Sequence, residues 1–275
     1  MAKIIAITNQ KGGVGKTTTA VNLSASLAAI GQRILLVDLD PQGSTTVSCG
    51  IDKDMLAKSV NDLLLDNLSC QEIVQATEWG FDLLPANGNL SVAELRMATI
   101  EGSDVRLKNA FKPIDQCYDY ILIDCPPALN ILAINALTAA ESVIVPLQCE
   151  YFALEGLSSL MNNIERIRRL SNPNLYIQGL LRTMYDGRNR LTIDVSHELL
   201  THFKDKVYQT IIPRNVRLAE APSHGMPVLA YDKQSQGAAS YLALAAEMLR
   251  RDEVVQQKPY PSSITEASCP QESLA

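Results

Sequence analysis

Lys3-Ile-Ile-Ala-Ile-Thr-Asn-Gln-Lys-Gly-Gly-Val-Gly-Lys-Thr-Thr18 is the stretch that decides the fold of this 275-residue chain. It opens with a short apolar run at 3–8, which is typical of a buried strand. A glycine-rich loop at Gln10–Thr18 follows. The loop leads into Lys16–Ile30, where apolar residues recur with helical period. The stretch therefore predicts a strand, a loop and a helix in that order.

The loop has the chemistry of a phosphate-binding loop. Gly12, Gly13 and Gly15 allow successive backbone N–H groups to converge on an anion at the N-terminus of the helix. The pattern places Lys16 where it reaches the β- and γ-phosphates of a nucleotide, and Thr17 where its hydroxyl ligates Mg²⁺. We therefore expect ATP and Mg²⁺ as cofactors. An ordinary glycine-rich turn would require neither the lysine nor the threonine.

The rest of the chain alternates short β-branched runs with helical patterns, which predicts βαβ units and a mainly parallel sheet. We expect a single-domain, doubly wound α/β fold of the P-loop class over residues 1–253, and a disordered tail over 254–275. The predicted strands are 3–8, 33–38, 81–85, 120–124, 142–146, 175–181 and 207–212. The predicted helices are 16–30, 105–116, 154–170, 192–203 and 238–250.

Acidic residues stand at the ends of two of the predicted strands. Asp38 and Asp40 follow the apolar run at 34–37, and Asp124 ends the run at 120–123. Ligands of open α/β sheets bind beyond the carboxyl ends of the strands, so these carboxylates should face the phosphates. There they can hold Mg²⁺ and its waters or orient an attacking water. A structural role as a turn or helix-cap residue stays open, above all for Asp38.

The composition of the chain argues against several other classes of protein. The six cysteines form no Cys-x-x-Cys pair, which argues against a structural zinc site and a disulfide framework. No uncharged run is long enough to span a bilayer, and the first residues lack the features of a signal peptide. We therefore expect a cytoplasmic protein without a membrane partner.

These motifs together resemble a known family. The segment 11–18 resembles the deviant Walker A box of the ParA/MinD ATPases, whose standard counterpart has a glycine where this chain has Gln10 and lacks the extra Lys11. The segments 37–43 and 121–127 resemble the switch I and the Walker B/switch II of that family. The segments 147–156 and 212–225 are similar to the chromosomal ParA, or Soj, branch. The resemblance covers about residues 1–252.

The resemblance implies roles for particular residues. Lys11 is the signature lysine that reaches the partner's phosphates in an ATP-bound sandwich homodimer, and Asp40 positions the attacking water with Asp124 near Mg²⁺. Pro213 and Asn215 contact adenine, and Glu150 contacts the ribose across the dimer. Pro213 and Asn215 also fit a strand end followed by a helix cap. The nucleotide-binding set is completed by the loop residues Lys11, Gly12, Gly13, Val14, Gly15, Lys16, Thr17 and Thr18.

The distribution of charge along the chain indicates whether the protein can bind nucleic acid. The chain has a net charge of −6, yet residues 161–220 hold ten Lys/Arg against six Asp/Glu. Arg188 and Arg190 lie in an expected surface turn, and the resemblance associates an arginine of this segment with DNA, with Arg217 as a further candidate. We expect non-specific binding of double-stranded DNA through these arginines. Ordinary solvated arginines, or packing of Arg217 near the nucleotide, remain the alternatives.

The resemblance predicts a partitioning ATPase. ATP would drive dimerisation on nucleoid DNA, and a ParB-like partner would stimulate hydrolysis during chromosome or plasmid segregation. A MinD-like membrane-associated ATPase is one alternative, although the segment 249–258 mixes charges and forms no large apolar face. A metabolic P-loop ligase or synthetase is another, but it would not explain the segments 147–156 and 212–225.

Overall fold

The chain folds around one twisted, eight-stranded sheet whose strand order is β3-β4-β2-β5-β1-β6-β7-β8. This computed structural model describes residues 1–257 and the side chains of residues 1–253. The strands are β1 (Lys3–Ile7), β2 (Ile34–Asp38), β3 (Gln75–Ala76), β4 (Asp82–Leu84), β5 (Tyr120–Asp124), β6 (Ser142–Gln148), β7 (Tyr176–Tyr185) and β8 (Val207–Pro213). All paired strands are parallel except β3 and β4. The doubly wound, mainly parallel sheet is thus confirmed.

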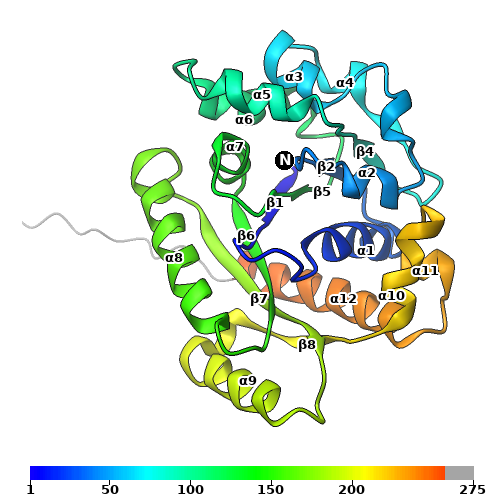
Figure 1. Ribbon diagram of the computed structural model, residues 1–275, viewed down its shortest axis with the longest axis vertical. Coiled ribbons are helices and arrows are strands. Elements are labelled where there is room, and N and C mark those ends of the chain that lie inside the picture. The colour runs from blue at the N-terminus through cyan, green and yellow to red at the C-terminus, as the bar shows by residue number, and fades with distance from the viewer. Residues whose placement is uncertain (258–275) are drawn as a thin grey trace, which may run out of the picture.

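Helices cover both faces of the sheet (Figure 1). They are α1 (Lys16–Ala29), α2 (Ser44–Ser48), α3 (Val60–Asp66), α4 (Cys70–Ile73), α5 (Leu90–Met97), α6 (Arg106–Phe111), α7 (Ile131–Ala139), α8 (Ala153–Leu170), α9 (Arg190–Phe203), α10 (Val216–Glu220), α11 (Val228–Tyr231) and α12 (Gln236–Gln257). Helices α1 and α12 lie side by side on one face, and α7 and α8 lie on the other.

The central strands are apolar throughout because each strand is buried on both sides. In β5, Leu122 packs with the helices α1 and α12, whereas Ile121 and Ile123 pack into the opposite layer. All three side chains have no exposed surface. Side chains of a strand alternate between the faces, so a strand covered on both sides has no polar position left. This is why uninterrupted apolar runs located these strands in the sequence.

Two of the expected helices have other bounds in the structure, and the helices α2 to α5, α7, α10 and α11 were not predicted. The helix expected over 105–116 is divided into α6 and two flanking 3₁₀ turns, Ser103–Val105 and Lys112–Ile114. Pro113 lies in the second turn, and a proline supplies no N–H for an α-helical hydrogen bond. Helix α12 extends to Gln257, past the boundary expected at residue 253, because the sequence has no glycine or proline between Gly237 and Pro259. The remainder of the predicted tail, 258–275, lies outside the described residues.

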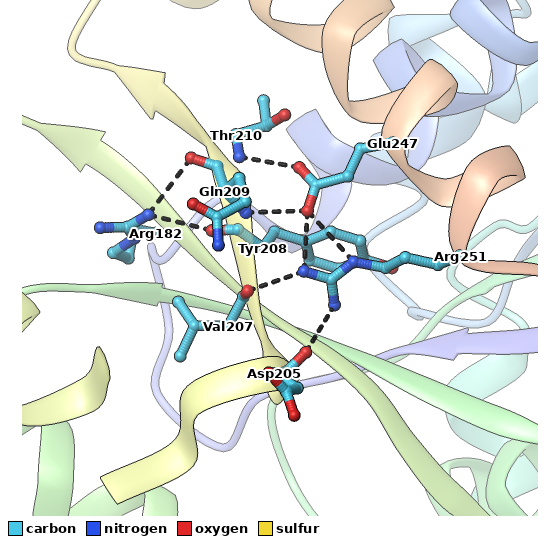
Figure 2. Close-up of polar contacts among 8 residues, drawn as sticks. All are labelled: Arg182, Asp205, Val207, Tyr208, Gln209, Thr210, Glu247 and Arg251. Carbon is cyan, nitrogen blue, oxygen red and sulfur yellow. Dashed lines mark hydrogen bonds and ion pairs between the residues drawn. The ribbon is translucent and has the colours of Figure 1, made fainter. Parts of the chain in front are cut away.

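Side chains hold the edge strand β8 where its register with β7 shifts (Figure 2). On one side of β8, the buried Arg182 donates to the carbonyl oxygens of Tyr208 and Gln209, at 2.9 and 3.3 Å. On the other side, Glu247 of α12 accepts from the amides of Gln209 and Thr210, each at 2.8 Å. Backbone groups that a bulge leaves unpaired are therefore satisfied by charged side chains. The first half of β8 is fixed as a result.

Candidate functional site: a nucleotide site at the carboxyl ends of the strands

The loop Gln10–Thr18 connects the carboxyl end of the central strand β1 to the N-terminus of α1. Gly13 and Gly15 adopt positive φ values of 73° and 86°, which side chains other than glycine rarely tolerate. A Cβ atom at Gly12 or Gly13 would meet no atom within 4 Å, so open space faces this part of the loop. Thr183 of β7 holds the loop in place by donating to the carbonyl oxygen of Val14 at 2.8 Å. The loop is thus a preformed cradle for an anion.

The two lysines of the loop point to different places. Lys16 is buried, and its Nζ donates to the carbonyl oxygen of Lys11 at 3.3 Å, across the mouth of the loop. Burial lowers the pKa of Lys16, and the nearby Asp124 opposes that shift. Lys11 is exposed, and its Nζ lies 2.6 Å from Oε2 of Glu150. The ammonium group of Lys16 therefore lies inside the loop Gln10–Thr18, whereas the ammonium group of Lys11 lies on the outer rim of that loop.

Two threonine hydroxyls converge on one carboxylate. Oδ2 of Asp124 accepts hydrogen bonds from Thr17 of α1 at 2.8 Å and from Thr45 of α2 at 2.7 Å. The other oxygen, Oδ1, is buried and has no hydrogen-bond partner among the described residues. A buried carboxylate oxygen in this state suits a water molecule of a hydrated Mg²⁺. Thr17 and Asp124 together therefore fit a magnesium site.

The described residues offer no other metal centre. Within 1–253, no group of three or more His, Cys, Asp or Glu side chains could hold a metal ion. Magnesium does not require such a cage, because it commonly takes one or two protein ligands, substrate phosphates and waters. The site next to Thr17 agrees with that pattern.

Asp38 and Asp40 differ although they are close in sequence. Asp38 has no exposed surface; Oδ2 accepts from the amide and hydroxyl of Thr46 at 2.8 and 2.7 Å, and Oδ1 accepts from the amide of Asp40. It therefore fulfils the structural alternative of a turn residue. Asp40 is half-buried, and its Oδ1 accepts from the amide of Gln42 at 2.9 Å. Its Oδ2 takes part in none of the hydrogen bonds found in the described residues. This oxygen is therefore available to accept a hydrogen bond from a water molecule in the site.

The buried carboxylates make the free energy of unfolding depend on pH. Burial raises the pKa of Asp38 to about 7 and that of Asp124 to about 6. The ordinary value in an unfolded chain is about 3.9, so the folded chain binds these protons more tightly. The free energy of unfolding should then fall as the pH rises from about 4 to about 7. We expect a higher melting temperature at pH 6 than at pH 8 for the nucleotide-free protein, measured by calorimetry.

The matched control for this pH dependence is Asp38→Asn, which removes the group with the larger shift and keeps its shape. This variant should show a smaller difference between the two pH values than the wild type. An equal or higher melting temperature of the wild type at pH 8 would contradict the assignment of these pKa values.

A cavity of about 200 Å³ adjoins the loop, on the side of β8. Its lining is mainly apolar and includes both predicted adenine contacts: Gly15, Thr18, Thr183, Met184, Ile212, Pro213, Arg214, Asn215, Leu218, Ala219 and Tyr241. Asn215 also caps α10 by accepting from the amide of Arg217 at 2.9 Å. The cap interpretation is therefore confirmed, and the contact with a base stays a prediction. An apolar cavity beside a phosphate cradle has the form that a purine requires.

The sequence pointed to the loop and the strand-end acids but missed three polar contributors. They are Thr45 of α2, Thr183 of β7 and Tyr241 of α12, which lie outside the loop in sequence and reach the site through the fold. Thr183 lies just beyond the carboxyl end of the strand predicted at 175–181. This position is the one feature of the sequence that could have identified Thr183 as a site residue.

The candidate DNA arginines lie at the same edge of the sheet but differ in their partners. Arg188 lies before α9 and pairs with its neighbour Asp186 at 2.9 Å. Arg190, the first residue of α9, is exposed and takes part in none of the ion pairs of the described residues. Arg217 pairs with Glu220 at 2.9 Å and with Asp232 at 3.2 Å. The positive charge of Arg217 is therefore already balanced within the chain.

Comparisons with known proteins agree with this geometry. The family model described as an AAA domain matches residues 2–177. The chain is 53% identical to the sporulation initiation inhibitor protein Soj of Bacillus subtilis, over 90% of this chain and 98% of that one. It is 48% identical to the chromosome partitioning protein ParA of Caulobacter vibrioides, over 93% and 97% of the two chains.

A solved structure is also similar over nearly the whole chain. It is a cobyrinic acid a,c-diamide synthase of Mycobacterium smegmatis with a bound ATP analogue and magnesium. It is 37% identical, has a TM-score of 0.82, and the match covers 94% of this chain and 99% of that one. The identities to Soj and ParA are higher. The chain belongs to the ParA/Soj family of chromosome-partitioning ATPases.

Proposed function

We propose that this chain is an ATP-driven DNA-partitioning switch. It binds ATP with Mg²⁺ at the loop Gln10–Thr18, forms a sandwich homodimer, and in that state binds duplex DNA without sequence preference. A ParB-like partner stimulates hydrolysis, and the dimer then releases the DNA. The protein would act in the cytoplasm on the nucleoid. The observation that carries this proposal is the position of Lys11.

The ammonium group of Lys11 lies where it can serve a second copy of the chain. Its side chain is 42% exposed, and its partner Glu150 is 50% exposed. Exposed ion pairs of this kind contribute little, about 0–1 kcal/mol, so leaving Glu150 has a small cost. A hydrogen bond to a phosphate of the partner's nucleotide would be charge-assisted and stronger. Glu150 would in turn become available to the partner's ribose.

The surface beside this ion pair is apolar. Tyr151 and Phe152 follow Glu150, are 76% and 63% exposed, and meet edge to face with ring centroids 5.0 Å apart. Aromatic residues are enriched at protein interfaces relative to the rest of the surface. This surface supports the face around Lys11 as the dimer face.

Apart from Lys11 and Glu150 of the partner, the residues proposed to act on one nucleotide come from a single chain. Magnesium, when bound, would supply charge neutralisation between the β- and γ-phosphates. Thr17 and Asp124 would hold it, Lys16 would bind the β- and γ-phosphates, and Asp40 would orient the attacking water. The cavity lined by Pro213 and Asn215 would take the base. Solved relatives that contain an ATP analogue or ADP with magnesium support this assignment.

The partitioning branch is favoured over the two alternatives. A synthase is among the solved relatives at 37% identity, but the identity to Soj is 53%. The MinD structures of Pyrococcus are 24% and 25% identical. An ATP hydrolysis assay separates the partitioning ATPase from the synthetase. The partitioning ATPase should hydrolyse ATP with DNA alone, and its rate should not depend on a small-molecule acceptor.

Filter binding of unrelated duplexes at several salt concentrations tests the DNA function. The wild type should bind only with ATP, with a dissociation constant of about 10⁻⁴–10⁻⁶ M at physiological salt. The double variant Arg188→Glu/Arg190→Glu should bind more than about tenfold more weakly and lower the salt slope by about two for each chain. Arg217→Glu should have a smaller effect, because Glu220 and Asp232 already balance that charge.

A charge-matched control is Lys108→Glu/Lys112→Glu. Both lysines are exposed, and they lie in α6 and in the 3₁₀ turn that precede β5. This double variant should bind DNA as the wild type does. Equal loss in this control and in Arg188→Glu/Arg190→Glu would assign the effect to net charge and remove the arginine surface. No ATP-dependent binding by the wild type would remove DNA from the function.

A further inference from the structure

Thr45 connects the helix α2 to the centre of the site. Its hydroxyl donates to Oδ2 of Asp124 at 2.7 Å, and this is the oxygen that also accepts from Thr17. Thr45 has no exposed surface, and Asp124 is 1% exposed. One buried carboxylate oxygen therefore joins the first residues of α1, the end of β5 and the first turn of α2.

The next residue fastens the same turn to the neighbouring strand. Thr46 donates through its amide and hydroxyl to Asp38, and it accepts from the amide of Ala86 at 2.9 Å. Asp38 and Asp124 are paired positions of β2 and β5. Two adjacent threonines thus hold the first turn of α2 to the ends of two adjacent strands.

The loop that carries Asp40 is the segment between these attachments. It starts after Asp38, whose Oδ1 accepts from the amide of Asp40 at 3.2 Å. It ends at α2, where Thr45 bonds to Asp124. The hydroxyl of Thr45 is therefore the side-chain contact that holds the end of the Asp40 loop to the Asp124 carboxylate, in addition to the backbone bond from the Leu39 amide to the Asp124 carbonyl oxygen at 3.0 Å.

We infer that Thr45 is a positioning residue for ATP hydrolysis: its hydroxyl orients the Asp124 carboxylate, with Oδ1 toward the magnesium site, and ties the Asp40 loop to it. The inference rests on the proposed roles of Asp40 and Asp124. Thr17 alone leaves Asp124 one donor from α1 and no connection to α2. Loss of the Thr45 hydroxyl should therefore impair the chemical step more than nucleotide binding.

Kinetics separate this role from simple packing. Thr45→Val replaces the hydroxyl with a methyl group at similar volume, and Thr45→Ser keeps the hydroxyl. The loss of a hydrogen bond to a charged group corresponds to about a ten- to hundredfold change in a rate or equilibrium constant. We expect kcat of Thr45→Val to fall by that factor with KM for ATP within about threefold, and Thr45→Ser to retain kcat within about threefold. Ser48→Ala is the control, because Ser48 lies in α2 and donates only to the carbonyl oxygen of Ser44.

A second readout needs neither nucleotide nor metal. Trp79 is the only tryptophan of the chain, and its indole N–H donates to the carbonyl oxygen of Cys49, at the C-terminal end of α2. Its fluorescence therefore reports how firmly α2 is held. Acrylamide should quench Trp79 more strongly in nucleotide-free Thr45→Val than in the wild type, Thr45→Ser or Ser48→Ala.

Three results obtained with folded variants would overturn the inference. They are a kcat of Thr45→Val within twofold of the wild type, a loss in Thr45→Ser as large as in Thr45→Val, and equal quenching of Trp79 in all variants. If Thr45→Val and the smaller Thr45→Ala both unfold, as judged by circular dichroism, the hydroxyl maintains the fold and the positioning role is wrong. Normal hydrolysis by Asp40→Ala and Asp124→Asn would instead overturn the proposed site.

Discussion

Lys16→Ala should lose measurable ATP binding. Lys16 is the buried cation of the loop, and its Nζ already lies across the mouth of the cradle near the Lys11 carbonyl oxygen. Several charge-assisted hydrogen bonds to the β- and γ-phosphates would be lost together, and each contributes about 1.5–3 kcal/mol. We expect the dissociation constant for ATP with Mg²⁺ to rise at least a hundredfold in a calorimetric titration.

The control for Lys16→Ala is Lys112→Ala, which removes an exposed lysine from the 3₁₀ turn before β5, near the other end of the sheet. Its affinity for ATP should equal that of the wild type. A dissociation constant of Lys16→Ala within about threefold of the wild type, in a variant that melts normally, would show that the nucleotide binds elsewhere.

Asp40→Ala should bind ATP normally and hydrolyse it about 10²–10⁴ times more slowly. A group that positions or activates a nucleophile usually contributes rate factors of this size. Asp40 is half-buried, and only its Oδ1 is committed to the backbone of its own turn, through the Gln42 amide. Single-turnover hydrolysis with saturating ATP measures the chemical step separately from product release.

Asp66→Ala provides the comparison for Asp40→Ala, because Asp66 is an exposed aspartate at the end of α3. It should hydrolyse ATP at the rate of the wild type. If Asp40→Ala also hydrolysed at that rate, the water-positioning role would pass to Asp124 or to another group.

The sheet was predictable because burial leaves a strong pattern in the sequence. All seven expected strands occur, since a parallel strand covered on both faces must be apolar along its length. Strand β3 has only two residues, Gln75–Ala76, and leaves no pattern. The region 44–97 contains helices α2 to α5, of four to eight residues, and these are too short for a helical period to stand out.

The site was predictable only where the local sequence carries the chemistry. A phosphate loop needs glycines at fixed positions next to a lysine, so Gly13, Gly15 and Lys16 could be identified without a structure. Thr45 could not, because a threonine after a turn has no distinguishing feature until β5 brings Asp124 within 2.7 Å of it. The pairing of Lys11 with Glu150 joins positions far apart in sequence and depends on β6 lying next to β1.

The conversion of a monomer into a dimer by ATP is the central step of the proposed function. Sedimentation velocity of Asp40→Ala, which keeps its ATP, measures this directly in parallel samples with ATP, with ADP and without nucleotide. We expect a monomer without nucleotide and with ADP, a dimer with ATP, and a monomer with ATP when Lys11→Ala is added to the variant. A monomer in all samples, or the same dimer with and without ATP, would contradict the proposed function.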